Sequence, residues 1–98
     1  MTQVSYAPRA RADLLRLADF LAKEDPGSAQ ETAALIIHGI QILERHPLVG
    51  RLVPESTMRE LVISRGRTGY LALYEYDPSI DVVVVNAIRH QREAGFED

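Results

Sequence analysis

The 98-residue sequence contains no cysteine and only one lysine, Lys23. The absence of cysteine excludes disulfides, thiolate zinc sites and thiol nucleophiles, and it fits a reducing compartment. No stretch approaches the run of about 18 apolar residues that a membrane span requires. The first residues lack a basic segment followed by an apolar run, so we expect no signal peptide. These absences favour a cytoplasmic protein.

An excess of positive charge is also missing, since the net charge is −3. Nucleic-acid binders usually carry a basic surface because phosphate contacts dominate their affinity. A mildly acidic chain is therefore a poor candidate for binding bare RNA, the ribosome or a specific DNA sequence by itself. The stretch from Arg59 to Arg67 nevertheless holds three arginines and one acid, Glu60. The sequence thus allows a local basic patch on an acidic protein.

The apolar residues that are present, 46% of the chain, suffice for one modest core, and we expect residues 1–98 to form a single domain. A short alternating segment at Val4–Tyr6 predicts a strand. Apolar residues then recur at helical spacing over about 8–24, and again from Asp25–Pro26 to about Arg45, before Pro47. The connection between these two helices is short, so they should form an antiparallel hairpin.

The second half of the chain changes to a period of two, which is typical of strands. Residues 46–58 contain two prolines and one glycine and predict a loop. Strands are predicted at about 59–64, Tyr70–Tyr76 and Asp81–Arg89. The valine run inside the last strand favours a central strand that is buried on both faces. The predicted fold class is α+β with the order β-α-α-β-β-β, in which an N-terminal antiparallel helical hairpin packs on a small, mainly antiparallel sheet.

Six segments of the sequence, in this order, resemble toxins of the ParE/RelE superfamily. They are Tyr6-Ala7-Pro8-Arg9-Ala10, Asp13-Leu14-Leu15, Asp25-Pro26, His46-Pro47-Leu48-Val49-Gly50-Arg51, Arg59-Glu60-Leu61 and Ile88-Arg89-His90-Gln91-Arg92-Glu93. The resemblance implies the toxin of a type II toxin–antitoxin system, without a cofactor, neutralised by a cognate ParD-like antitoxin. It leaves two targets open, because ParE-like members block DNA gyrase and RelE-like members cut messenger RNA on the ribosome.

RNA cleavage by 2′-hydroxyl attack needs a base, a cation that stabilises the phosphorane and an acid. By resemblance to RelE-like members, the candidates are Glu60, with Glu55 as an alternative base, Arg65, Arg67 and His90. Two further comparisons with that family weaken the ribonuclease interpretation. Leu71 holds the place of the family's usual nuclease arginine, and no tyrosine follows His90. The sequence therefore favours a ParE-like gyrase inhibitor that is not an enzyme. The ribonuclease is the alternative. A third hypothesis is an inactive toxin that survives as an interaction module.

Each candidate side chain also has an ordinary structural explanation. The candidate target-binding residues are Arg59, Glu60, Arg65, Arg67, Arg89 and His90. Arg59 and Glu60 are equally consistent with a cross-strand ion pair at a sheet edge, and Arg89 is in a position to pair with Glu60. A lone histidine at a strand end, such as His90, is more often a hydrogen-bonded structural residue.

The predicted first helix carries the candidate antitoxin-binding residues, Leu15 and Ala22. If they point away from the sheet, they leave an apolar strip that an antitoxin segment can cover by folding on binding. His38 and His46 share no metal-ligand spacing with acidic residues, so we assign no metal site.

Overall fold

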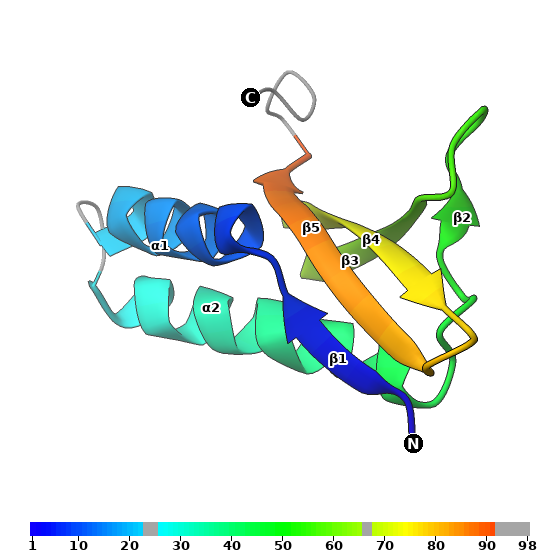
Figure 1. The fold of residues 1–98 in the computed structure, drawn as a ribbon. Coiled ribbons are helices and arrows are strands. Elements are labelled where there is room, and N and C mark those ends of the chain that lie inside the picture. The colour runs from blue at the N-terminus through cyan, green and yellow to red at the C-terminus, as the bar shows by residue number, and fades with distance from the viewer. Residues whose placement is uncertain (23–25, 66–67, 92–98) are drawn as a thin grey trace.

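The computed structural model describes residues 1–22, 26–65 and 68–91. The described chain forms an α+β fold, as predicted (Figure 1). Its elements are β1 (Gln3–Tyr6), α1 (Pro8–Ala22), α2 (Pro26–Ile40), the 3-10 helix η1 (Gln41–Glu44), β2 (Arg51–Leu52), β3 (Arg59–Arg65), β4 (Thr68–Asp77) and β5 (Val82–His90).

The strands form one sheet in the order β1-β5-β4-β3-β2. β1 is parallel to β5, and the other neighbouring pairs are antiparallel, so the expected mainly antiparallel sheet is confirmed. The parallel pair forms because the helical hairpin carries the chain from β1 back to the start of the three-stranded meander. Both helices lie on the same side of the sheet, and no described helix covers its opposite side (Figure 1).

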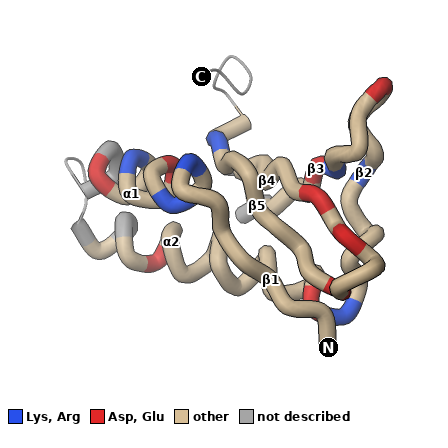
Figure 2. The backbone as a smooth tube through the Cα atoms, in the orientation of Figure 1, with Lys and Arg blue, Asp and Glu red and all other residues tan. Residues whose placement is uncertain are grey.

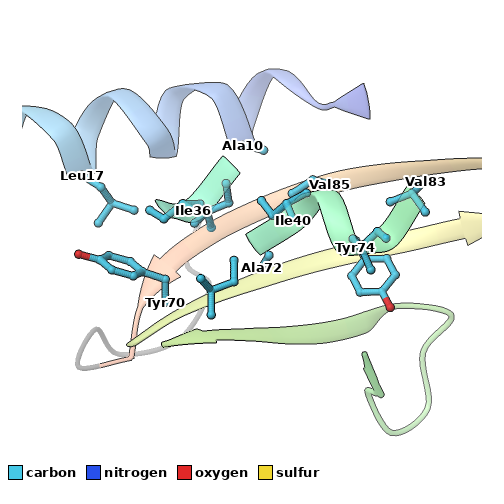
Figure 3. Close-up of a cluster of buried hydrophobic side chains, with 12 residues drawn as sticks. Ala10, Leu17, Ile36, Ile40, Tyr70, Ala72, Tyr74, Val83 and Val85 are labelled. Atoms are coloured by element: carbon cyan, nitrogen blue, oxygen red, sulfur yellow. The ribbon is translucent and has the colours of Figure 1, made fainter. Parts of the chain in front are cut away.

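The core lies between the helical hairpin and the sheet. Ala10 and Leu17 of α1 and Ile36 and Ile40 of α2 pack against alternate residues of β4 and β5 (Figure 3). In β4 these are Tyr70, Ala72 and Tyr74, which are all buried. The face of this strand that carries Tyr70 and Tyr74 is therefore the face that packs against the helices, because side chains of a strand alternate between the two faces.

Two local predictions were wrong. The second helix ends as an α-helix at Ile40 and continues as the 3-10 turn η1, in which Arg45 N–H donates to Ile42 O at 3.1 Å. The tighter turn keeps Leu43 fully buried at the end of the helix. The segment 46–58 is not only a loop, because it contains β2, which pairs with the start of β3.

The valine run is also buried differently from the prediction. β5 is an inner strand, but only Val83 and Val85 are fully buried, whereas Val82 and Val84 are half-buried. The reason is that the helices cover one face of the sheet only. Farther along β5 a register shift opposite Leu73 and Tyr74 accommodates one extra residue, Asn86, whose side chain donates to Glu75 at 3.2 Å.

Candidate functional site

In the three antiparallel strands, side chains alternate between two faces of the sheet. One face packs against the helices, and we call it the helix side; the other points away from them. Ile63 of β3 and Tyr70 of β4 are direct partners and are buried under the helices. Residues one position away from them in each strand therefore point to the other side. We call this side the outer face, and it comprises Glu60, Val62, Leu71, Leu73, Ala87 and Arg89.

The centre of the outer face is apolar. Leu71 is paired with Val62 on one side and with Arg89 on the other. Leu71 is only 7% exposed, whereas the neighbouring Val62 is 55% exposed. The position where a RelE-like nuclease would need an arginine therefore holds a packed leucine beside an exposed valine. The centre of the outer face is therefore apolar, with Arg89 beside Leu71 on the neighbouring strand.

Glu60 of the outer face is already engaged in an ion pair. Its carboxylate lies 3.1 Å from the Arg51 guanidinium of β2, and the Arg51 side chain is largely exposed. Such an exposed pair contributes little to stability because water screens it. Arg51 is a partner of Glu60 that the sequence analysis missed.

Arg59 points to the helix side and binds backbone atoms. Its Nη1 donates to the carbonyl oxygens of Gly50, at 2.9 Å, and Leu48, at 3.2 Å. The Gly50 N–H in turn donates to the hydroxyl of Tyr74, at 2.8 Å. Burial raises the pKa of this tyrosine, which keeps its hydroxyl neutral. Arg59 thus holds the segment before β2 through that segment's backbone carbonyl oxygens.

His90 also lies on the helix side. It is the direct partner of Tyr70, and the two rings meet edge to face with centroids 5.2 Å apart. Glu60, by contrast, belongs to the outer face, two strands away. The candidate base and the candidate acid of the ribonuclease hypothesis therefore lie on opposite sides of the sheet.

The remaining arginines of the candidate set are placed only in part. Arg65 ends β3 and its backbone pairs with Thr68. The Arg65 side chain and all of Arg67 fall outside the described part of the structure. Arg89 does lie on the outer face, where its Nη1 donates to the carbonyl oxygens of His90 and Gln91.

The first helix contributes two polar side chains to the edge of the sheet. Asp13 accepts a hydrogen bond from the Ile88 backbone N–H at 2.9 Å, and Arg16 Nη2 lies 3.4 Å from the Ile88 carbonyl oxygen. β1 ends at Tyr6 and so cannot reach this part of β5. The two side chains take the place of a neighbouring strand, which sequence periodicity alone does not reveal.

Leu15 on the same helix is 67% exposed, as expected for a residue that points away from the sheet. The Ala22 side chain is outside the described part of the structure, so the predicted antitoxin surface rests on Leu15. Among the described residues, no group of three or more histidine or acidic side chains is arranged to hold a metal ion. The described helices include none that is long and apolar enough to cross a membrane.

The charged side chains are unevenly distributed. Arginines gather on α1, whereas carboxylates gather along β4 and the turn that follows it (Figure 2). In that turn the Asp81 carboxylate accepts hydrogen bonds from the hydroxyls of Thr2, at 2.7 Å, and Tyr76, at 2.8 Å. These two bonds lower the pKa of Asp81, and the same carboxylate raises the pKa of Tyr76.

Comparison with known proteins places this fold among toxins. The family model for the ParE toxin of the type II toxin–antitoxin system parDE matches residues 4–95. Toxin RelE3 of Caulobacter vibrioides is 38% identical over 93 residues, which cover 95% of this chain and 98% of the relative.

Two solved structures are similar over nearly the whole chain. One is a chromosomal ParDE toxin–antitoxin system from P. aeruginosa, with a TM-score of 0.78 and 18% identity, covering 92% of this chain and 96% of that chain. At that identity the likeness concerns the fold alone. The other is the RelBE2 toxin–antitoxin complex from Mycobacterium tuberculosis, with a TM-score of 0.63 and 29% identity, covering 92% of this chain and 98% of that chain.

Proposed function

Because this chain belongs to the ParE toxin family of type II toxin–antitoxin systems, we propose that it arrests growth by inhibiting DNA gyrase and is neutralised by a cognate ParD-like antitoxin. Inhibition of this kind requires a surface that binds a protein and no proton transfer. The proposal makes the toxin a cytoplasmic inhibitor without a cofactor.

The separation of Glu60 from His90 is the observation that carries the proposal. A general acid and a general base must both lie within hydrogen-bond reach of one reacting group, directly or through a water. Glu60 faces outward and is paired with Arg51, whereas His90 stacks on the buried Tyr70 on the helix side. A single phosphate cannot contact both side chains without a rearrangement of the sheet.

The outer face supports a protein partner over a nucleic acid. Its centre is formed by Leu71 and Val62, and apolar contact is typical of the middle of a protein interface. Affinity for RNA comes largely from phosphate contacts, which a chain with a net charge of −3 does not favour. We therefore assign the outer face, with Glu60 and Arg89 at its margins, to contact with gyrase.

The antitoxin is assigned to the helical side of the molecule. Two of the structural neighbours are toxin–antitoxin complexes named RelBE, and a third is a ParDE system. On this chain Leu15 exposes most of its side chain on α1, away from the outer face. An apolar residue there suits an antitoxin segment that becomes ordered on binding.

Purified toxin added to gyrase and relaxed plasmid tests the proposal. We expect supercoiling to stop and cleaved DNA to accumulate. Val62→Arg, in the middle of the outer face, should weaken the inhibition, whereas Ile80→Arg, at an equally exposed apolar position in the turn before β5, should not. Unimpaired supercoiling with wild-type toxin in excess would contradict the proposal.

A ribosome-dependent ribonuclease is the second candidate, favoured by one finding, the 38% identity to a relative named Toxin RelE3. Its residues would be Glu60, Arg65, Arg67 and His90. Toxin added to translating ribosomes should then cut the messenger RNA, and His90→Ala should abolish the cut. Intact message at a toxin concentration that arrests growth would exclude this function.

A further inference from the structure

The segment that joins η1 to β2 exposes an unusual amount of apolar side chain. Leu48, Val49 and Leu52 lie within five residues of one another, and each is more than half exposed. Single exposed apolar residues are common on protein surfaces, but clusters usually mark an interface. We call these three side chains, on segment 46–52, the apolar loop.

The apolar loop is held in place by the core. Arg59 Nη1 donates to the carbonyl oxygens of Gly50 and Leu48, and Gly50 N–H donates to the Tyr74 hydroxyl. A Cβ atom added to Gly50 would lie 2.6 Å from a ring carbon of Tyr74, so the backbone and the ring are in close contact. The exposed side chains are therefore presented by a fixed backbone, which reduces the entropy that a partner must remove on binding.

The same bonds limit the kind of partner that fits. A peptide that binds by strand addition needs unoccupied backbone N–H and carbonyl groups. Here the carbonyls of Leu48 and Gly50 and the N–H of Gly50 are already engaged inside the molecule. These three groups cannot pair with an added strand, so at Leu48 and Gly50 the loop offers its side chains for contact, which suits the surface of a folded protein.

The charged residues near the apolar loop further limit the kind of partner that fits. Two exposed arginines lie near the apolar side chains, Arg45 just before segment 46–52 and Arg51 within it. The chain as a whole is acidic. Arg51 also pairs with Glu60 of the outer face, and its neighbour Leu52 is the strand partner of Arg59. The apolar loop and the outer face thus adjoin across β2.

We propose that the apolar loop is part of the surface that holds gyrase, and that it contacts an apolar patch flanked by carboxylates on that protein. Arg59 and Tyr74 act as positioning residues, which shape the loop without touching the partner. This inference rests on the proposed function, and it extends the contact surface from the outer face around the β2 edge.

The test compares two variants that differ in where apolar surface is removed. One is the triple variant Leu48→Ser, Val49→Ser and Leu52→Ser, and the control is Ile80→Ser, which removes an exposed apolar side chain in the turn before β5. We expect the triple variant to need about tenfold more toxin, or more, to inhibit gyrase, which is the effect of removing interface hot spots. The control should inhibit like wild type, and both should melt like wild type and be pulled down by the antitoxin.

The positioning role of Arg59 needs a readout that a general loss of stability would not give. Arg59→Lys keeps the charge, but its side chain ends one atom short of Nη1, the atom that donates to both carbonyl oxygens. It should weaken gyrase inhibition by the wild-type loop and have no added effect in the triple variant, since the two changes would then act through one surface. Equal effects of Arg59→Lys in the wild-type and triple-variant backgrounds would show that Arg59 does not act through the apolar loop.

The outcomes separate the two proposals. A triple variant that inhibits gyrase as well as wild type would overturn this inference and leave the proposed function intact. A triple variant that loses the antitoxin but keeps gyrase inhibition would assign the apolar loop to the antitoxin and also overturn it. A wild-type toxin without effect on gyrase would overturn the proposed function, and this inference with it.

Discussion

The carboxylate of Asp13 in α1 accepts a hydrogen bond of 2.9 Å from the backbone N–H of Ile88 in β5. The two residues are 75 positions apart in the chain, and the bond joins the first helix to the last strand. It forms where β1 has ended and β5 would otherwise present an open edge. The Asp13 side chain accepts the hydrogen bond that a neighbouring strand would otherwise accept, because a partly buried N–H needs a hydrogen-bond partner.

Asp13→Ala should lower the free energy of unfolding by about 1–3 kcal/mol, the usual cost of leaving a buried donor without its acceptor. Asp13→Asn keeps an oxygen at the same place and should lose less. Asp19→Ala, on the exposed face of the same helix, serves as the control. Urea denaturation of the three variants measures the difference, and equal midpoints for Asp13→Ala and the control would contradict the role of this bond.

Gly50→Ala should destabilise the protein by about 1–3 kcal/mol, the typical cost of forcing an extra methyl group into a packed site. The added Cβ would approach Cε1 of Tyr74 to 2.6 Å, and the ring, which is fully buried, has little room to move. Val49→Ala, one residue earlier but exposed, should change the unfolding free energy by less than about 0.5 kcal/mol. Thermal or urea unfolding of both variants checks the contrast.

Stability below neutral pH should depend on Asp81. Its pKa in the folded protein is lowered, so the folded state favours the charged form, and the stabilisation is present above the ordinary aspartate pKa of about 3.9. It is lost as the pH falls through the lowered value. Asp81→Asn should therefore reduce the drop in melting temperature between pH 7 and strongly acidic pH.

One further variant accompanies that pH series. Tyr76→Phe removes one of the two hydroxyls that bind the Asp81 carboxylate and should reduce the acid sensitivity in part. Asparagine tolerates the left-handed backbone of Asp81, which has φ = 53°, so Asp81→Asn tests the charge rather than the turn. An unchanged pH profile in both variants would show that this carboxylate does not couple folding to pH.

His90→Ala should leave growth arrest intact if the toxin is a gyrase inhibitor. The ring packs on Tyr70 on the helix side, so its loss should cost about 0.5–1.5 kcal/mol of stability, as for other aromatic pairs. His90→Phe restores an aromatic edge without an acid group. Loss of arrest in both variants, with a fold that still melts cooperatively, would favour the ribonuclease instead.

Leu15→Glu should weaken binding of the cognate antitoxin without lowering the melting temperature. Leu15 is 67% exposed on α1, so a charge there disturbs no core contact but opposes an apolar partner. Ile80→Glu provides a matched exposed position in the turn before β5. Pull-down of each variant by tagged antitoxin measures the effect, and equal recovery of the two would place the antitoxin elsewhere.

Much of the fold follows from local patterns in the chain. Helical spacing located α1 and most of α2, and alternation located β3, β4 and β5, because these periods determine which residues can share a buried face. β2 escaped detection since two residues carry no measurable period. The outer face was not predictable in detail either, because its membership depends on the register between strands.

The candidate residues illustrate the same limit. Arg59 and His90 were expected on a target surface, yet their register places both on the helix side, against the Gly50 carbonyl and the Tyr70 ring. Glu60 lies on the outer face, and its partner there is Arg51. Successive residues of a strand point to opposite sides of the sheet, so motif spacing alone does not determine which side a given residue faces.

The sequence by itself determined the α+β class, the helical hairpin and the toxin family, because each depends on patterns that recur along the chain. Only the tertiary structure decided which chemical groups meet. It placed Glu60 and His90 on opposite faces, Asp13 at the edge of β5 and Arg59 behind the apolar loop. These contacts join residues far apart in sequence, and they arise only when packing of the core brings the two halves of the chain together.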